Sequence, residues 1–408
     1  MKAEDISEAL NEINEEYIES ANEIRKPKAK KSNWVKWVSA AAAIAIICFA
    51  GAKIFYVNDP IVYAPELDEG ETEYGGLTLP LLVYEAVDAV SYGFEGYMAY
   101  DVSELENGNP WNDDMVFETL PVFRNNSFNE IGIAYPGIGE EKMMEKLESS
   151  AKALDFELEN ITKTLVSDFA AGTGFPNDAI YSISANFGSH TVEIESNGNI
   201  TVMFNGFEGE ELPDGYNFTH TNTTEGEAFE TIAYLYENYS KIIGIEDATF
   251  VTSGDYSYEG EFIRNYSIYD FSGDELNDML NFAFNKVQLA PNDEGKLMLI
   301  RISDHLSLTE KIGDYPVISV EEATDMLLDG GYITTVPYEI PGKKYISKIE
   351  LIYRGSIGEN IWMPYYRFLV EIPELEQENG LKNFGAYYVP AIEMEYITGL
   401  PLWNGSFN

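Results

Sequence analysis

Residues Trp34–Val57 read WVKWVSAAAAIAIICFAGAKIFYV, and this stretch decides where the rest of the chain is placed. From Trp37 to Val57 it has 21 residues and a single charge, on Lys53. A helix of that length is about 31 Å long, close to the hydrocarbon thickness of a bilayer. The stretch therefore predicts one transmembrane helix over residues 34–57, with the lipid bilayer as its partner.

The charges on either side of this stretch predict its orientation. Basic residues gather between Arg25 and Lys36, directly before the apolar run. Residues 1–57 carry eight acidic and eight basic side chains, so the whole net charge of −45 lies in the 351 residues that follow. We therefore expect a single-pass protein of the cell membrane, with a cytoplasmic N-terminus and an extracellular C-terminal part. Because that part repels polyanions, no nucleic-acid partner is expected.

The composition predicts ordered domains beyond the membrane. Apolar residues make up 45% of the chain and aromatic residues 13%, which is enough to form a sizeable core. The single cysteine, Cys48, lies in the apolar run, so no disulfide framework is expected.

The chain before and after the predicted span divides into short segments. Residues 1–33 form a cytoplasmic segment in which residues 4–24 show helical spacing of apolar positions, with an acidic opposite face. This helix either docks on a cytoplasmic partner through Leu10, Ile13 and Tyr17, lies at the bilayer, or has no function; its acidic face argues against contact with anionic lipid, so docking is favoured over the bilayer. Residues 58–76 are acidic, rich in Pro and Gly, and predict a linker.

The remaining residues predict an α+β fold in which antiparallel sheets are each packed with a helix. Three units are expected, over residues 77–215, 216–315 and 316–408. Helices are predicted at 140–154 and 225–243, and a third begins after Ser319, an N-cap with Glu322 three residues later. Strands are predicted at 179–187, 191–195, 200–204, 249–253, 262–271, 281–289, 296–302, 349–353, 366–372 and 386–394.

Two parts of the chain resemble known bacterial proteins. Residues 9–21, ALNEINEEYIESA, followed by basic residues and one span, resemble Firmicutes single-pass proteins, some of them anti-sigma-factor-like. The stretches ISVEEA (318–323), IELIY (349–353), MPYYRF (363–368) and YYVPAI (387–392) are similar to the PepSY-like part of YycH/YycI-type regulators. This resemblance implies PepSY-like units in an outer domain that restrains a sensor kinase of the cell wall. It implies no catalytic residues.

The sequence has no motif that predicts catalytic residues, a cofactor or a metal site. The three histidines, His190, His220 and His305, form no zinc motif, and G-x-S-x-G is absent. Calcium is the most plausible ion, at residues 112–114 or 292–294, but both segments are better interpreted as turns.

Aromatic residues of the C-terminal unit offer a second candidate surface. Alternation along the strands places about half of such residues in a core, and the rest face outward. The candidate partner-binding residues are Leu10, Ile13 and Tyr17 of the N-terminal helix, together with Trp362, Tyr365, Tyr366 and Tyr387. A core position for the last four is the stronger interpretation.

These observations together predict a membrane-anchored extracytoplasmic regulatory or sensory protein that acts by binding a protein or a ligand. A sensor kinase or a sigma factor is the expected partner, and no enzyme activity is expected. The alternative is a tethered extracellular enzyme that acts on cell-wall polysaccharide. Such an enzyme needs a pair of carboxylates, and in so acidic a chain suitable pairs arise by chance, so their presence neither supports nor excludes it.

Overall fold

The computed structural model describes residues 71–74, 77–86, 95–105, 107–129, 132–168, 174–403 and 405. The predicted cytoplasmic helix, with Leu10, Ile13 and Tyr17, and the predicted span at 34–57 lie outside these residues. None of the helices in the described part of the chain combines the length and apolar character needed to cross a bilayer.

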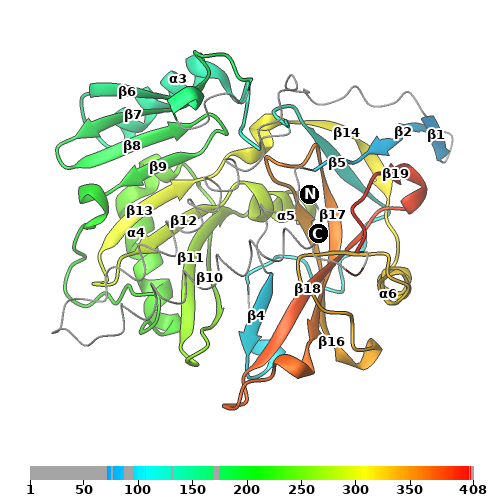
Figure 1. Cartoon of the computed structure of the whole chain (residues 1–408). Helices are drawn as coiled ribbons and strands as arrows, with labels where there is room; N and C mark the ends of the chain where they lie inside the picture. The colour runs from blue at the N-terminus through cyan, green and yellow to red at the C-terminus, as the bar shows by residue number, and fades with distance from the viewer. Residues whose placement is uncertain are drawn as a thin grey trace, which may run out of the picture. The chain divides into compact units, whose positions relative to one another are not determined.

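An antiparallel eight-stranded sheet forms the first half of the fold (Figure 1). Its strands, in spatial order, are β10 (Ala248–Tyr256), β11 (Phe262–Asp270), β12 (Val287–Pro291), β13 (Leu297–Ile302), β9 (Ile200–Met203), β8 (His190–Glu195), β7 (Ile180–Phe187) and β6 (Glu159–Leu165). The β8–β9 turn contains Gly198 at φ 91°, a left-handed conformation that glycine adopts without strain. The strands predicted at 191–195 and 200–204 are therefore joined as a hairpin through residues 196–199.

Two helices cover one face of this sheet. They are α3 (Gly139–Ala153) and α4 (Glu225–Ile243). Helix α4 begins with a capping box between Thr224 and Glu227 and ends at Gly244, which is left-handed. Its Ile232 and Leu235 are buried in the core, whereas Phe229 is 37% exposed.

A seven-stranded antiparallel sheet forms the second half of the fold. The order β14–β5–β17–β18–β15 is extended by β16, which also pairs with β17, and by β4, which also pairs with β18. These strands are β4 (Gly96–Ala99), β5 (Thr119–Asn125), β14 (Thr309–Pro316), β15 (Ile333–Thr334), β16 (Ile346–Arg354), β17 (Ile361–Glu371) and β18 (Lys382–Pro390). Two smaller pairs accompany it: β1 (Glu71–Tyr74) with β2 (Leu77–Pro80), and β3 (Leu82–Val83) with β19 (Ile397–Thr398).

The two faces of β17 belong to two different cores. Side chains at even positions, such as Trp362 and Phe368, pack with α5 (Glu275–Phe284) and α6 (Val320–Leu328). Side chains at odd positions, such as Tyr365 and Leu369, pack with a second cluster that includes Leu82, Tyr84, Leu105, Ile392 and Tyr396. Helix α5 lies between the two sheets and contacts β11 and β16 (Figure 1).

Short 3-10 helices connect several of these elements. They are η2 (Val102–Glu104), η3 (Val166–Asp168), η4 (Asn205–Phe207), η5 (His305–Leu308), η6 (Lys343–Tyr345), η7 (Pro373–Leu375) and η8 (Met394–Tyr396).

The predicted α+β class with antiparallel sheets is confirmed, and α6 begins with the predicted Ser319–Glu322 capping box. The predicted strand at 281–289 is wrong over its first half, because Glu275–Phe284 is helix α5 and β12 starts only at Val287. The Asp274 carboxylate caps α5 by accepting the Asn277 N–H at 3.0 Å. A short apolar run without clear periodicity does not distinguish a buried strand from a buried helix.

The sheets also group the chain differently from the three predicted units. Strands of 159–203 and of 248–302 share one sheet, and β4 and β5 pair with strands of the C-terminal part. The reason is long-range pairing: β5 lies between β14 and β17, more than 180 residues away, and local sequence patterns carry no information on such partners.

Candidate binding site at the junction of the two sheets

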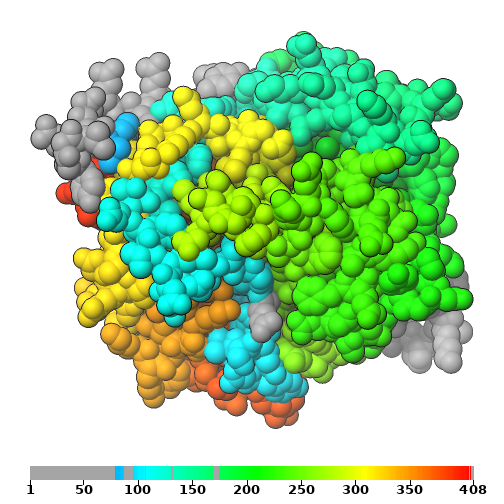
Figure 2. Space-filling view, turned by 180° about the vertical axis from the view of Figure 1, so that it is seen from behind, coloured from blue at the N-terminus to red at the C-terminus, as the bar shows by residue number. Residues whose placement is uncertain are grey.

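The edge of the second sheet meets the end of the β10–β11 hairpin. The Met98 N–H of β4 donates a hydrogen bond to the Asp255 carboxylate of β10. Burial raises the pKa of Asp255, although this hydrogen bond opposes the shift. The Tyr100 and Tyr256 rings meet edge to face, with centroids 5.2 Å apart. Figure 2 shows the blue and cyan atoms after residue 95 directly against the yellow-green atoms of the hairpin.

A pocket of about 360 Å³ opens at this junction. Part of its lining, here called the η2 wall, is Ser103 and Glu104 of η2, and another part is Thr221 and Thr223 with Glu225, where α4 begins. The floor is formed by side chains of the β10–β11 hairpin: Thr252, Tyr256, Phe262 and Arg264. The pocket therefore combines hydroxyl groups, two aromatic rings, two carboxylates and one guanidinium.

Strand register places Arg264 in the floor. Arg264 is the direct partner of Gly254, and Phe262 that of Tyr256, so Arg264, Phe262 and Tyr256 share one face of the hairpin. A Cβ atom at Gly254 would lie 2.1 Å from the Ile263 carbonyl oxygen and 2.9 Å from the Phe262 ring, so glycine is required for this close approach.

Neutral groups hold the Arg264 guanidinium in place. Its Nε donates to the Thr223 carbonyl at 3.1 Å, and its Nη1 donates to the Thr252 hydroxyl at 3.2 Å. The guanidinium carbon lies 5.0 Å from the centre of the Phe262 ring, within the range of a cation–π contact.

Glu104 is a fixed acceptor in the η2 wall. It closes a capping box with Asp101, and its Oε2 accepts the Tyr100 N–H at 2.9 Å. A hydrogen bond with the Tyr256 hydroxyl links the same carboxyl group to the hairpin, while burial raises the pKa of Tyr256.

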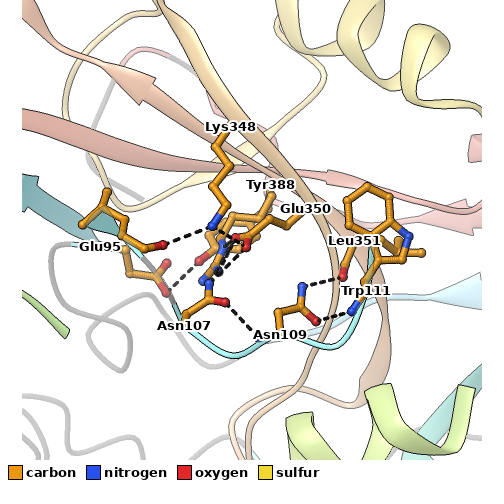
Figure 3. A network of polar contacts seen from close by, with 10 residues as sticks. Glu95, Asn107, Asn109, Trp111, Lys348, Glu350, Leu351 and Tyr388 are labelled. Carbon is orange, nitrogen blue, oxygen red and sulfur yellow. Dashed lines mark hydrogen bonds and ion pairs between the residues drawn. The ribbon is translucent and has the colours of Figure 1, made fainter. Parts of the chain in front are cut away.

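A buried ion network beneath η2 supports this wall (Figure 3). Its centre is Glu350 of β16, which is 5% exposed. The carboxylate accepts hydrogen bonds from Arg367 Nη2 at 2.6 Å and from Asn107 Nδ2 at 3.2 Å, and it pairs with Lys348 Nζ at 3.0 Å. Burial alone raises the pKa of Glu350, but the two cations outweigh it, so the pKa lies below its usual value.

The same network ties the chain after η2 to the sheet. Lys348 Nζ also donates to the Leu105 carbonyl at 3.1 Å, and Leu105 directly follows Glu104. The Asn109 side chain donates to the Leu351 carbonyl at 3.0 Å. The position of the Glu104 wall is therefore set by β16.

A second ion pair lies beside the first. Arg354 contacts Glu95 at 3.3 Å and lies 4.2 Å from the centre of the Tyr388 ring. The Tyr388 hydroxyl donates to Glu95 at 3.1 Å. In Figure 3, Glu95 and Tyr388 lie next to the Glu350 network, so a continuous polar layer follows this end of the sheet.

The burial of four aromatic residues argues against the partner surface proposed for them. Trp362, Tyr365, Tyr366 and Tyr387 are all 5% exposed or less, so they are core residues. Three of their polar groups find backbone acceptors: Trp362 Nε1 donates to Ser356, Tyr366 to Ile318 and Tyr387 to Tyr338. Burying large aromatic area while pairing the polar tip stabilises the fold and leaves little surface for a partner.

The other sequence candidates serve structural roles. The Asn112 and Asn292 side chains accept the N–H groups of Asp114 and Glu294, which is the hydrogen-bond pattern of a turn. Within the described ranges, no three His, Cys, Asp or Glu side chains are grouped as a metal site. His305 is packed against Trp362, and burial lowers its pKa.

Sequence reasoning missed Arg264 and the Glu350 network. A signal existed for the network, since Glu350 and Arg367 each interrupt an apolar strand, and a charge in such a position needs a buried partner. Arg264 carries no such signal, because it stands next to Asn265 in a strand that mixes apolar and polar residues.

The chain matches no protein-family model, and a search of curated proteins finds no match. The functional argument therefore depends on the geometry of the junction.

Proposed function

We propose that this chain is a membrane-anchored extracytoplasmic sensory or regulatory protein that binds a ligand in the junction pocket. The predicted span at 34–57 anchors it, and the predicted helix at 4–24 transmits the bound state to a cytoplasmic partner. The resemblance to YycH/YycI-type and anti-sigma-factor-like proteins makes a sensor kinase or a sigma factor the proposed partner, and PepSY-like units the proposed origin of the C-terminal half.

The observation that carries this proposal is the composition of the pocket walls. One wall, η2, is tied to the seven-stranded sheet, and the floor belongs to the eight-stranded sheet. A ligand that touches both favours one relative arrangement of the sheets over others, and such differential affinity is what a sensor requires.

Binding is a better account than catalysis for these residues. The Glu104 carboxylate is occupied as a cap, and the Arg264 guanidinium is fixed by Thr223 and Thr252. Fixed donors and acceptors suit recognition, whereas hydrolysis of a glycan needs a proton-donating acid opposite a second carboxylate. We expect the full-length chain to release no reducing ends from cell-wall glycans.

The proposal is tested by combining a pocket substitution with a deletion of the predicted output helix. Thr221→Trp places an indole in the pocket from a half-buried loop position. The matched control is Thr162→Trp, at an exposed position of β6, the opposite edge of the sheet from β10.

Transcripts are measured in cells that carry the full-length variants at equal export levels. We expect Thr221→Trp to change a set of transcripts, Thr162→Trp to leave them unchanged, and deletion of residues 4–24 to abolish the effect of Thr221→Trp. If Thr221→Trp has no effect, or has the same effect without residues 4–24, the proposed function is wrong.

A further inference from the structure

Arg264 is a preorganised cation without an anionic partner. Two neutral oxygens and one ring hold the guanidinium, and among the described residues no carboxylate lies within ion-pair distance of it. Among the described residues Arg124 and Arg301 also lack such a partner, but neither lines the pocket. Arg367, by contrast, is neutralised by Glu350 at 2.6 Å.

The geometry leaves most of the Arg264 donors for a ligand. A guanidinium has five N–H groups, and the protein uses one on Nε and one on Nη1. The remaining donors belong to a group that lines the pocket, so they can form a bidentate contact with a planar carboxylate.

The lining of the pocket also holds two negative charges. They are Glu104 of η2 and Glu225, the first residue of α4. A ligand that was only an anion would be attracted by Arg264 and repelled by these two carboxylates. A ligand with an ammonium group at its other end is attracted by both kinds of charge.

We propose that the pocket binds a zwitterionic amino acid or short peptide, with its carboxylate on Arg264 and its ammonium group facing Glu104. Tyr256 and Phe262 contact the apolar part between the two charges. The pocket volume of about 360 Å³ lies at the low end of the range for small-molecule sites, about 300–1,000 Å³, which favours one or two residues over a longer chain. This inference rests on the proposed function of the same pocket and names its ligand class.

Calorimetric titration of the full-length chain in detergent micelles tests the proposal. The probes are alanyl-alanine, its N-acetyl derivative, its C-terminal amide, and alanine as the free amino acid. We expect alanyl-alanine to bind, and removal of either charge to weaken binding at least tenfold, which corresponds to about 1.4 kcal/mol. Alanine tells the two ligand sizes apart. If it binds as tightly as alanyl-alanine, the site is one for a free amino acid; if it binds more weakly, the site is one for a peptide.

Two Arg264 variants and one control connect the binding to this residue. Arg264→Met removes the charge and should abolish binding, while Arg264→Lys keeps the charge but not the fork and should retain weakened binding. The matched control is Arg301→Met on β13 of the same sheet, where Arg301 contacts the Thr201 hydroxyl, and it should bind as the wild type does. Unfolding midpoints of the variants show whether each one folds.

The outcomes separate the two proposals. Equal binding of the N-acetyl derivative shows a site for anions only and overturns the zwitterion. Absence of binding, or binding that folded Arg264→Met retains, also overturns it. The transcript experiment is read separately. If Thr221→Trp changes transcripts only when residues 4–24 are present, the proposed function stands, even where one of these binding results shows that the ligand class is wrong.

Discussion

The substitution Glu350→Gln tests the ion network that positions the pocket wall. It preserves the size of the side chain but removes the charge that Arg367, Lys348 and Asn107 contact. The new amide also turns a donor toward one of these cations. Removing one partner of a buried ion pair costs about 3–5 kcal/mol.

The exposure of the partners places the expected loss at the lower end of this range. The Glu350 side chain is 7% exposed and that of Arg367 is 14%, but the Lys348 side chain is 32% exposed and water can solvate it. We therefore expect the free energy of unfolding at pH 7 to fall by about 3 kcal/mol. The measurement is urea unfolding of the full-length chain, followed by tryptophan fluorescence.

The pH dependence gives a second readout of the same network. Glu350 has a folded-state pKa below its ordinary value of 4.5, so the unfolded chain binds its proton more readily. Its contribution is fully present above pH 4.5 and is lost as the pH falls through the folded-state pKa. The difference between the wild type and Glu350→Gln should therefore shrink on acidification.

The matched control is Asp314→Asn, which removes a carboxylate from an exposed pair with Lys311 at 2.8 Å. Both side chains are about half exposed, 51% and 48%, so the loss should stay below about 1 kcal/mol. Equal losses for the two variants, or a Glu350→Gln effect that does not change with pH, would refute the reasoning.

Three further substitutions probe particular elements of the fold by the same unfolding measurement. Asp274→Ala removes the N-cap of α5 and should cost about 1 kcal/mol, whereas an unchanged stability would contradict the cap. Gly108→Ala places a Cβ 2.2 Å from a Val251 methyl group at φ 72° and should cost about 2 kcal/mol, part of which Val251→Ala should restore. Burial lowers the pKa of Lys286 to about 8, so the unfolded state binds more protons and stability should rise from pH 8 to 10.5. Lys286→Met should remove this rise and add about 3 kcal/mol at pH 7; a slope that persists in the variant would contradict the assignment.

Local sequence signals predicted the elements that local interactions determine. Helix α4 was predicted over its observed bounds, because periodic apolar positions coincide with the Thr224–Glu227 capping box and Gly244. Helix α5 was missed, because its apolar face is short and is buried between two sheets. Tertiary packing decided its conformation against an ambiguous local pattern.

The candidate site depends on contacts between residues far apart in the sequence. Glu104 and Arg264 lie 160 residues apart, and neither stands in a motif. Their approach follows from β4 joining β18 and from the Met98–Asp255 contact, which no periodicity encodes. The aromatic cluster around Trp362 shows the converse: its composition left a core and a partner surface open, with the core as the stronger interpretation, and the residues are buried.

Hydrogen–deuterium exchange of the full-length chain, with and without saturating alanyl-alanine, tests the junction pocket most directly. The ligand should slow amide exchange in peptides covering residues 100–104, 219–225 and 250–264, while β6 at the far edge of the sheet exchanges as before. Unchanged exchange in these three segments, or protection confined to other parts of the chain, would contradict the assignment of the pocket as the ligand site.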